Sequence, residues 1–364
     1  MKILVVQDYL RSGGTERQSV LLANALAAAG HTATLLTFRP GGALTETVAN
    51  NVTFRALQFL DLGLDWFAPG LMRAVRTAAP DLVLCLGRMA NCYAGGIQHA
   101  FPTLPVVATM RTGQPLPWLF RRSLRSARHI VANSHEARDN LVAQYDVAGE
   151  KISVIHNSLV FPPASALWRN APLRTQHGAT TTTTVLLNVA MFRPEKNQRE
   201  LIEIVAGLPA PLDWQLWLAG EGSARAACEQ LVAEKNLGAR VKFLGFRRDP
   251  TPLYCAADLA VHASWSEALS NFLIEAQAHG LLAVAYEAQG IRECFKPGRT
   301  GWVIPRHDRA AFRTTLSRRI SEPEIAHAER SADARHYART TFDPAQQVAA
   351  YLALFQKLTG SPAS

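Results

Sequence analysis

The sequence lacks any apolar run of the roughly 20 residues that a membrane-spanning helix requires. Charged residues account for only 18% of the 364 positions and apolar residues for 48%, as in a folded globular protein. The apolar stretch at residues 1–6 is short and no small-residue cleavage site follows it, so we interpret it as a buried strand rather than a secretion signal. We therefore expect a cytoplasmic protein, and the chain length predicts two domains.

Cysteine is scarce and scattered. No pair has C-x-x-C spacing, and none lies near two histidines at the spacing of a zinc site, so a structural metal and a disulfide framework are both disfavoured. We predict buried thiols in a reducing compartment, and a protein that uses neither a metal nor a cofactor. The cysteines are Cys85, Cys92, Cys228, Cys255 and Cys294.

Two further motifs are missing. No G-x-G-x-x-G follows the first strand, and the second predicted strand, residues 31–38, ends without an acidic residue, which disfavours a nicotinamide oxidoreductase. The net charge of +9 favours an anionic partner. Zinc fingers, RNP-like aromatic motifs and basic recognition helices are absent, however, so we do not expect nucleic acid.

The first strand, residues 2–7, leads instead into a glycine loop over residues 11–17 that contains Gly13 and Gly14. A helix over residues 18–29 and the second strand follow. Strand, glycine loop, helix and strand open a Rossmann-like unit. Paired glycines either let backbone amides approach a ligand closely or allow a tight turn, and both interpretations stay open.

Strand and helix patterns alternate along the rest of the chain, which predicts an α/β protein. Arg88, Asn91 and Arg111 follow strand ends, where open parallel sheets bind ligands, so they are candidates for a ligand site. A Pro-, Ala- and Thr-rich segment separates two such halves. The predicted boundaries are 1–165 for an N-terminal Rossmann-like domain, 166–184 for a linker and 185–342 for a C-terminal Rossmann-like domain, with a last helix at 343–364 that packs back on the first domain.

The most informative stretch is residues 264–280. Two carboxylates, Glu267 and Glu275, lie between an apolar strand-like segment and a glycine stop. Ser270 and Asn271 are good helix N-caps, so we place Glu267 on a strand-to-helix loop and Glu275 about one turn inside the helix. The amides of such a helix start bind phosphate without a metal, and the carboxylates are then available for hydroxyl groups. A solvated helix that carries two glutamates is the plain alternative.

Two basic segments add to this pattern. Arg193 and Lys196 bracket a strand-to-helix loop, where two cations would neutralise a diphosphate, or would be ordinary surface cations. Residues 116–128 combine Trp118 and Phe120 with four arginines, which indicates either a contact with an anionic membrane or a solvated surface helix. A membrane contact would place the protein at the inner face of the membrane.

Four motifs resemble those of the family-4 glycosyltransferases, retaining enzymes of the GT-B fold found in bacterial surface polysaccharide biosynthesis. The resemblance covers nearly the whole chain. It implies two Rossmann-like domains whose parallel sheets face a central cleft, with a nucleotide sugar bound by the C-terminal domain and the acceptor by the N-terminal one. The motifs are Gly13-Gly-Thr-Glu-Arg17, Leu244-Gly-Phe-Arg-Arg-Asp249, Ser266-Glu-Ala-Leu-Ser-Asn-Phe-Leu-Ile-Glu-Ala276 and Gly290-Ile-Arg-Glu293.

The resemblance also implies roles for single residues. Glu267 would hold hydroxyls of the donor sugar, and Glu275 would bind the ribose. Arg193 and Lys196 would bind the diphosphate and would form the catalytic set with Glu267. The other donor contacts that it implies are Gly13 and Gly14 from the N-terminal domain, Gly222, Phe246 and Arg247, and the helix start at Ser270, Asn271 and Phe272.

The sequence departs from the family pattern at three places. Ala268 replaces the glycine that often follows the first glutamate. The strand at residues 80–86 leads to no histidine, so Arg88 or Asn91 would cover part of that role. Ser158 stands where a glycine is usual after the strand at residues 151–156.

The predicted activity is metal-independent transfer of a sugar from a nucleoside-diphosphate sugar to a hydroxyl of a glycan or lipid-linked acceptor, with the anomeric configuration retained. A nucleotide-sugar epimerase of the same fold is one alternative, which product analysis with and without acceptor would separate. A non-catalytic nucleotide-sugar-binding protein is the other, and it would show neither transfer nor donor hydrolysis.

Overall fold

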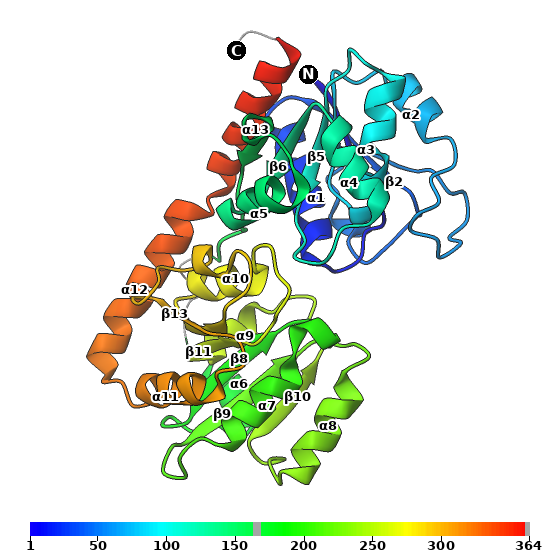
Figure 1. Ribbon diagram of the computed structural model, residues 1–364. Coiled ribbons are helices and arrows are strands. Elements are labelled where there is room, and N and C mark those ends of the chain that lie inside the picture. Colours follow the sequence, from blue (N-terminus) through cyan, green and yellow to red (C-terminus); the bar gives the residue numbers. More distant parts are fainter. Residues whose placement is uncertain (163–168, 361–364) are drawn as a thin grey trace. The chain divides into compact units, whose positions relative to one another are not determined.

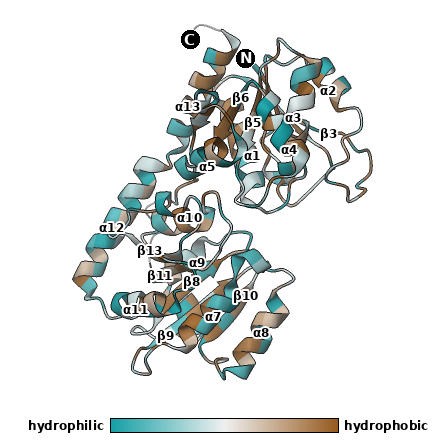
Figure 2. Ribbon diagram, viewed as in Figure 1, coloured by the Kyte–Doolittle hydropathy of each residue, from teal (hydrophilic) through white to brown (hydrophobic). Residues whose placement is uncertain are grey.

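The computed structural model describes residues 1–162 and 169–360 (Figure 1). The chain forms two compact units, which we call unit 1 (residues 1–158 with the chain from Pro344 onward) and unit 2 (residues 159–343). Each unit contains one parallel sheet with helices on both faces, and the central strands are among the most apolar segments (Figure 2).

The sheet of unit 1 has seven strands in the order β3-β2-β1-β4-β5-β6-β7. Its first strand lies inside the sheet, and all of that strand except Lys2 is buried, as its apolar run predicts. Side chains of a strand alternate between the two faces. Ile3 and Val5 accordingly join one core cluster, and Leu4 and Val6 join the other. The strands are β1 (Lys2–Gln7), β2 (Thr32–Thr37), β3 (Thr53–Ala56), β4 (Leu82–Cys85), β5 (Val106–Met110), β6 (His129–Ala132) and β7 (Ile152–Val154).

Helices cover both faces of this sheet. Helices α1 and α13 pack against one face, and α2 to α5 pack against the other. The last helix is fixed to unit 1 by polar contacts, because Gln347 donates to the His156 carbonyl at 2.7 Å and Arg111 donates to the Tyr351 hydroxyl at 2.8 Å. The helices are α1 (Gly14–Ala28), α2 (Leu71–Ala78), α3 (Arg88–Ala100), α4 (Trp118–Ser126), α5 (His135–Tyr145) and α13 (Pro344–Thr359), with short 3-10 turns η1 (Thr45–Thr47) and η2 (Gly149–Lys151).

The sheet of unit 2 has six strands in the order β10-β9-β8-β11-β12-β13. Helices α6, α9 and α10 pack on one face and α7, α8 and α11 on the other, while α12 contributes Ala338 to the first cluster and Ala334 to the second. The strands are β8 (Thr184–Val189), β9 (Trp214–Ala219), β10 (Val241–Gly245), β11 (Leu259–His262), β12 (Leu282–Tyr286) and β13 (Gly301–Ile304).

The helices of unit 2 follow its strands in the alternating pattern that the sequence predicts. They are α6 (Ala171–Gln176), α7 (Gln198–Ala206), α8 (Arg225–Glu234), α9 (Thr251–Ala256), α10 (Asn271–Ala278), α11 (Arg309–Ile320) and α12 (Glu324–Thr341), with 3-10 turns η4 (Pro194–Lys196) and η5 (Ile291–Glu293). Across the described ranges, no helix is both long enough and apolar enough to cross a bilayer.

The first six strands of unit 1 and the six strands of unit 2 follow one order. In each sheet the order of strand addition therefore reverses between the first and the fourth strand. These strands are β1 and β4 in unit 1 and β8 and β11 in unit 2. Open α/β sheets bind ligands outside the carboxyl ends of the strands at such a switch point. The predicted class, α/β with two Rossmann-like domains, is confirmed.

Several local expectations differ from the structure. Helix α1 begins at Gly14, so the glycine loop is shorter than residues 11–17. Strand β3 was not predicted, because a half-exposed edge strand carries no apolar run. Residues 166–168 of the predicted linker and 361–364 of the last helix lie outside the described residues. The rest of that linker contains α6, whose Arg174 is buried and donates to Asp258 at 2.8 Å within unit 2.

Candidate functional site

Three side chains meet at the switch point of unit 2. The Glu267 carboxylate, in the loop after β11, is 9% exposed. Its Oε1 accepts from Lys196 Nζ at 2.6 Å and lies 2.9 Å from His262 Nε2. Lys196 ends η4, in the loop after β8, and His262 is the last residue of β11. Two adjacent strands therefore bring together residues that are 71 positions apart in the sequence.

The charges in this cluster keep Glu267 ionised. Burial alone opposes ionisation of a carboxylate, but the Lys196 ammonium and the hydrogen bond from His262 outweigh burial and lower the Glu267 pKa to about 2. An ionised carboxylate can only accept, so His262 Nε2 carries the proton and donates it. Such a carboxylate is a weak base, which suits it to accepting hydrogen bonds rather than abstracting protons.

Backbone contacts hold the two loops of the cluster together. The Glu195 carbonyl accepts from the Trp265 amide at 3.1 Å and from the Ser264 hydroxyl at 3.0 Å. Gly290 is in the left-handed region, at φ 72°, and a Cβ there would lie 1.9 Å from the Ala268 carbonyl oxygen. Only glycine fits at that point, so the Gly290 turn packs directly against the Glu267 loop.

Helix α10 starts three residues after Ala268. The Ser270 hydroxyl caps it by accepting from the Leu273 amide at 3.5 Å. This neutral cap leaves the positive end of the helix dipole without a negative charge of its own. Asn271 and Phe272 are the first two residues of the helix, so of the two predicted caps Ser270 is the N-cap and Asn271 lies inside the helix. Amides in a first helical turn are suitable ligands for phosphate.

Glu275 lies one turn further along α10 and is half-buried. Its Oε2 accepts from the Tyr254 hydroxyl at 2.6 Å. The Tyr254 ring stacks on His279 at a centroid distance of 4.7 Å, which fixes the direction from which the hydroxyl donates. Glu267 and Glu275 are thus both anchored by protein donors, one before the helix start and one inside the helix.

The other predicted donor residues of unit 2 lie on neighbouring loops at the same edge of the sheet. Arg193 is about half exposed and lies 3.9 Å from the Glu195 carboxylate, so it shares the Lys196 loop without contacting Glu267. Gly222 follows β9 at φ 152°, and a Cβ there would lie 2.3 Å from the Phe192 carbonyl oxygen. Phe246 and Arg247 follow β10 and are exposed.

The predicted residues of unit 1 have mainly structural contacts. Gly13 caps α1 and lies under the Glu16 carboxylate, and Gly14 is the first residue of that helix. Arg88, at the start of α3, donates to the Gln114 side chain at 2.7 Å and to the Pro115 carbonyl at 2.8 Å. These contacts hold the loop that precedes α4.

Asn91 and Arg111 lie deeper in unit 1 than a strand-end position suggests. Asn91 is 1% exposed. Its side-chain oxygen accepts from the backbone amide of Thr109 at 2.7 Å and so joins α3 to β5. Arg111 donates to the Asn157 side chain at 2.5 Å as well as to α13. The sequence showed that these residues follow strands, but it did not show that neighbouring elements bind them.

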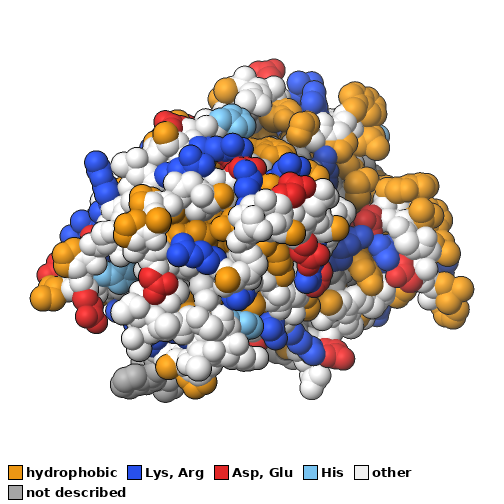
Figure 3. Space-filling model, turned by 90° about the horizontal axis from the view of Figure 1, so that it is seen from below, with side chains coloured by type: hydrophobic (Ala, Val, Ile, Leu, Met, Phe, Trp, Pro, Cys, Tyr) orange, Lys and Arg blue, Asp and Glu red, His pale blue; other side chains and the backbone are white. Residues whose placement is uncertain are grey.

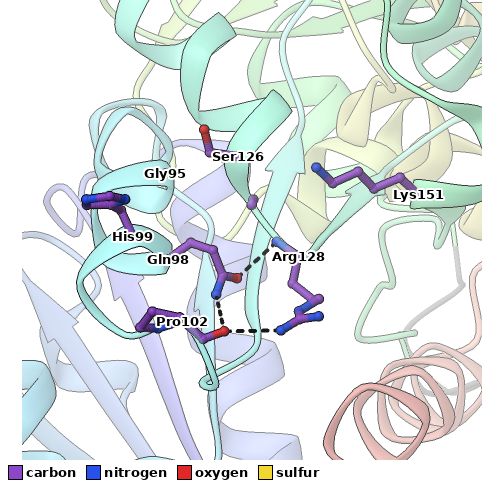
Figure 4. Close-up of a pocket in the computed structure, with 8 residues that line it drawn as sticks. Gly95, Gln98, His99, Pro102, Ser126, Arg128 and Lys151 are labelled. Carbon is purple, nitrogen blue, oxygen red and sulfur yellow. Dashed lines mark hydrogen bonds between the residues drawn. The ribbon is translucent and has the colours of Figure 1, made fainter.

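A cavity of about 460 Å³ lies elsewhere in unit 1 (Figure 4). Arg128 and Lys151 line it immediately before β6 and β7, with His99 from α3. Burial and the neighbouring Arg128 charge lower the pKa of Lys151. The cavity opens at the amino ends of the strands, which is the edge opposite the switch points, so it does not compete with the Glu267 cluster as the candidate site.

His262 is a contributor that could not be identified from the sequence pattern. It ends an apolar strand segment, which masks it among core residues, although its place at a strand end is a usable signal. Its Nδ1 atom is buried and has no hydrogen-bond partner among the described residues. The cluster offers one carboxylate that already faces an ammonium, a donor set unlike the several oxygens that Mg²⁺ requires.

Comparison with known proteins identifies the family of the chain. Residues 12–159 match the family described as Glycosyltransferase Family 4, and residues 170–341 match the family described as Glycosyl transferases group 1. The chain is 27% identical over 319 residues to the lipopolysaccharide core biosynthesis glycosyltransferase LpsE of Rhizobium meliloti, covering 86% of this chain and 88% of LpsE. It is 31% identical over 170 residues to the putative glycosyltransferase EpsD of Bacillus subtilis, covering 46% of this chain and 44% of EpsD.

Solved structures share the fold. Anabaena Alr3699/HepE in complex with UDP and glucose superposes with a TM-score of 0.81 at 22% identity, over 98% of this chain and 99% of that one. WaaG, a glycosyltransferase involved in lipopolysaccharide biosynthesis, superposes with a TM-score of 0.75 at 17% identity, over 99% and 100% of the two chains. The chain therefore belongs to the glycosyltransferases, with a family 4 domain followed by a group 1 domain.

Proposed function

We propose that this glycosyltransferase moves a sugar from a nucleoside-diphosphate sugar to a hydroxyl of a glycan or lipid-linked acceptor, without a metal and with retention of configuration. The observation that carries the proposal is the Lys196–Glu267–His262 cluster beside the start of α10. A cation, an ionised carboxylate and a helix start with a neutral cap all lie at the carboxyl edge of the unit 2 sheet. A sugar diphosphate needs this combination, because one end of it is anionic and the other carries hydroxyls.

In the proposed complex the diphosphate lies at the amides of Ser270, Asn271 and Phe272. Lys196 has three N–H donors and gives one to Glu267, so it is able to bridge the carboxylate and a phosphate oxygen. Arg193 adds a second cation on the same loop. Charge that develops on the leaving diphosphate is then stabilised by groups already in place.

The carboxylates take the hydroxyl groups in this proposal. Glu267 accepts from hydroxyls of the donor sugar, and Glu275 accepts from the ribose. Phe246 and Arg247 contact the base, and Gly222 lets the backbone approach the donor. Gly13 and Gly14, at the start of α1, are further donor contacts in this proposal. Unit 1 also supplies the acceptor or sugar side, with Arg88, Asn91 and Arg111 as candidates.

Retention follows from a front-face reaction. The bond between the anomeric carbon and the phosphate oxygen breaks while the acceptor oxygen bonds to that carbon on the same face, and the acceptor proton passes to the leaving phosphate. A pKa of about 2 makes Glu267 a poor general base, which favours the phosphate as proton acceptor. The solved HepE complex that contains UDP and glucose supports a nucleotide sugar as the donor class.

The relatives support surface polysaccharide assembly as the setting, since LpsE is named for lipopolysaccharide core biosynthesis. A lipid-linked acceptor would place the protein at the inner face of a membrane. The basic helix α4, with its exposed Trp118 and Leu119, is the contact that the sequence predicts for that position.

A thermal-shift screen against UDP, GDP, ADP and dTDP sugars in the presence of EDTA tests the donor. A ligand that binds only the native state raises the melting temperature, so one nucleotide series should do so without a metal. Calorimetry with the Arg193→Ala, Lys196→Ala double variant should show weaker binding of that nucleotide. Unchanged affinity would refute the diphosphate role.

Product analysis separates the alternatives. A transferase forms a glycoside only when acceptor is present, and NMR of that product should show the anomeric configuration of the donor. An epimerase would convert the nucleotide sugar without acceptor. A binding protein would yield neither transfer nor hydrolysis although the thermal shift persists.

A further inference from the structure

The loop between β3 and α2 in unit 1 projects apolar side chains into solvent. Residues 59–67 include six of the fourteen large hydrophobic side chains that are exposed in the described chain. Phe59 is 96% exposed, Leu60 66% and Trp66 56%. Single exposed apolar residues are ordinary, but a contiguous group of this size marks an interaction site. The group, which we call the apolar loop, is completed by Leu62, Leu64 and Phe67.

The apolar loop has a defined backbone conformation, because side chains of unit 1 donate hydrogen bonds to its carbonyls. Gln58 is 3% exposed, and its amide donates to the carbonyls of Leu64 at 2.9 Å and Phe67 at 2.7 Å. The Tyr93 hydroxyl of α3 donates to the Trp66 carbonyl at 2.5 Å. Three backbone carbonyls of the loop thus accept hydrogen bonds from the body of unit 1, while the apolar side chains are exposed.

The two acidic residues of the apolar loop are neutralised. Arg39 donates to both oxygens of Asp61, at 2.7 and 2.9 Å, and to Asp65 at 2.7 Å. Arg11 also pairs with Asp65, at 2.6 Å. The guanidinium of Arg39 lies 4.0 Å from the centroid of the Tyr9 ring, which supports it from the other side. Figure 3 shows orange side chains that project at its right margin, with blue and red side chains beside them toward the centre of the view.

The charge of the adjoining helices is strongly one-sided. Between residues 66 and 135 the sequence contains eight arginines and one acidic residue, Asp81. This region forms α2, α3 and α4, which cover the same face of the sheet. Arg73 and Arg76 are exposed on α2, which directly follows the apolar loop. Arg121 and Arg122 are exposed on α4.

We propose that the apolar loop inserts into an anionic lipid bilayer and is a membrane-docking element of unit 1 in its own right, separate from α4. A bilayer surface offers an apolar interior beneath a negative plane, which matches aromatic and aliphatic tips flanked by unbalanced arginines. Neutralised carboxylates and satisfied carbonyls remove the groups that would oppose insertion. The inference does not require sugar transfer, so its test is independent of the proposed reaction.

Vesicle flotation of the full chain tests this inference. Vesicles of phosphatidylglycerol and phosphatidylethanolamine should carry the wild-type protein, and vesicles of phosphatidylcholine should carry much less. The Phe59→Ser, Leu60→Ser, Trp66→Ser variant should lose at least tenfold in bound fraction. Ile325→Ser removes one apolar side chain that is 79% exposed on α12 of unit 2, and it should bind like the wild type.

Two further measurements keep the inference falsifiable. Quenching by brominated phospholipids should be lower in Trp66→Phe than in wild type, a comparison that needs no large change in the loop. Trp118→Ser with Leu119→Ser reports the contribution of α4 alone. Equal flotation of the wild type and the triple serine variant would overturn the inference. So would a wild-type dimer that becomes monomeric in that variant, because the apolar loop would then be covered by a second copy.

Discussion

The first six strands of unit 1 and the six strands of unit 2 have the same order, yet the carboxyl groups at the two switch points differ in their partners and in the direction of their pKa shifts. In unit 1 the residue is Asp8, directly after β1, and it accepts from the α3 amides of Met89 at 3.0 Å and Ala90 at 2.6 Å. Burial raises its pKa to about 7. In unit 2 the residue is Glu267, which is paired with Lys196 and has a pKa of about 2.

The difference shows which helix start is available for an anion. Helix α3 and helix α10 each follow the fourth strand of their sheet. The first amides of α3 already donate to the Asp8 carboxyl group, so they are not available for a second acceptor. Helix α10 is capped by the neutral Ser270 hydroxyl and has no acidic residue in its first turn, so in the proposed complex its dipole faces the phosphate. The same topology therefore leads to different N-terminal partners, a carboxyl group of the protein at α3 and a serine hydroxyl at α10.

The largest expected effect comes from removing the paired carboxylate of unit 2. Glu267→Gln keeps the shape of the side chain but loses its charge, and we expect the transfer rate to fall by roughly 10²–10³, the usual cost of one preorganised electrostatic group. Steady-state kinetics with donor and acceptor measure this, and far-UV circular dichroism checks the fold. Glu229→Gln, on the surface of α8, is the matched control. Turnover near the wild-type level in Glu267→Gln would refute the role of Glu267.

A second change makes α10 resemble α3. Aspartate and asparagine cap helices about as well as serine, so Ser270→Asp and Ser270→Asn differ in charge but not in size. We expect the dissociation constant for the nucleoside diphosphate to be at least about tenfold higher in Ser270→Asp than in Ser270→Asn, which is about 1.4 kcal/mol. Isothermal titration calorimetry gives both values. Equal affinities would show that the diphosphate does not lie at this helix start.

Much of this comparison could be predicted from the sequence. Apolar runs that alternate with helical patterns identified most of the strands, and the Ser-Asn cap signal placed Glu267 before a helix and Glu275 inside it. These are local properties of short segments. Local residue patterns were therefore sufficient to predict most of the strands and the positions of the two glutamates relative to the helix.

The partners of those glutamates could not be predicted. Lys196 reaches Glu267 only because β11 lies beside β8, and the order of strands in a sheet is not a local property. His262 was hidden inside an apolar segment, and Asp8 looked like the end of a strand. Both became informative when neighbouring elements supplied their hydrogen-bond partners. Asn91 shows the converse, since a strand-end position can lead into the core.

A third test removes the histidine from the unit 2 cluster. His262→Phe keeps a ring beside Phe272, whose ring centroid lies 5.7 Å from that of the histidine, but it loses the donor to Glu267. One stabilising contact of the ionised form is lost, so the Glu267 pKa should rise and the acid limb of kcat/KM should move to higher pH. We expect a loss of about tenfold near neutral pH, in line with one hydrogen bond to a charged group. An unshifted acid limb would mean that His262 only fills space.

The last test concerns the carboxylate of unit 1 and measures stability, with no effect on transfer expected. The Asp8 pKa is raised by burial from 3.8 to about 7 in the folded chain, so between these values the folded state keeps a proton that the unfolded state has released. Stability that depends on this proton is present at low pH and is lost as the pH rises towards 7, by about 1.4 kcal/mol per pH unit. Asp8→Asn does not titrate, and its amide still offers one acceptor for the Ala90 amide, so any fixed cost is the same at each pH. Urea unfolding at pH 5 and pH 6 should therefore show a steeper loss of stability in wild type than in Asp8→Asn. Parallel pH dependence in the two proteins would mean that Asp8 is ionised throughout, and that both switch points hold a charged carboxylate after all.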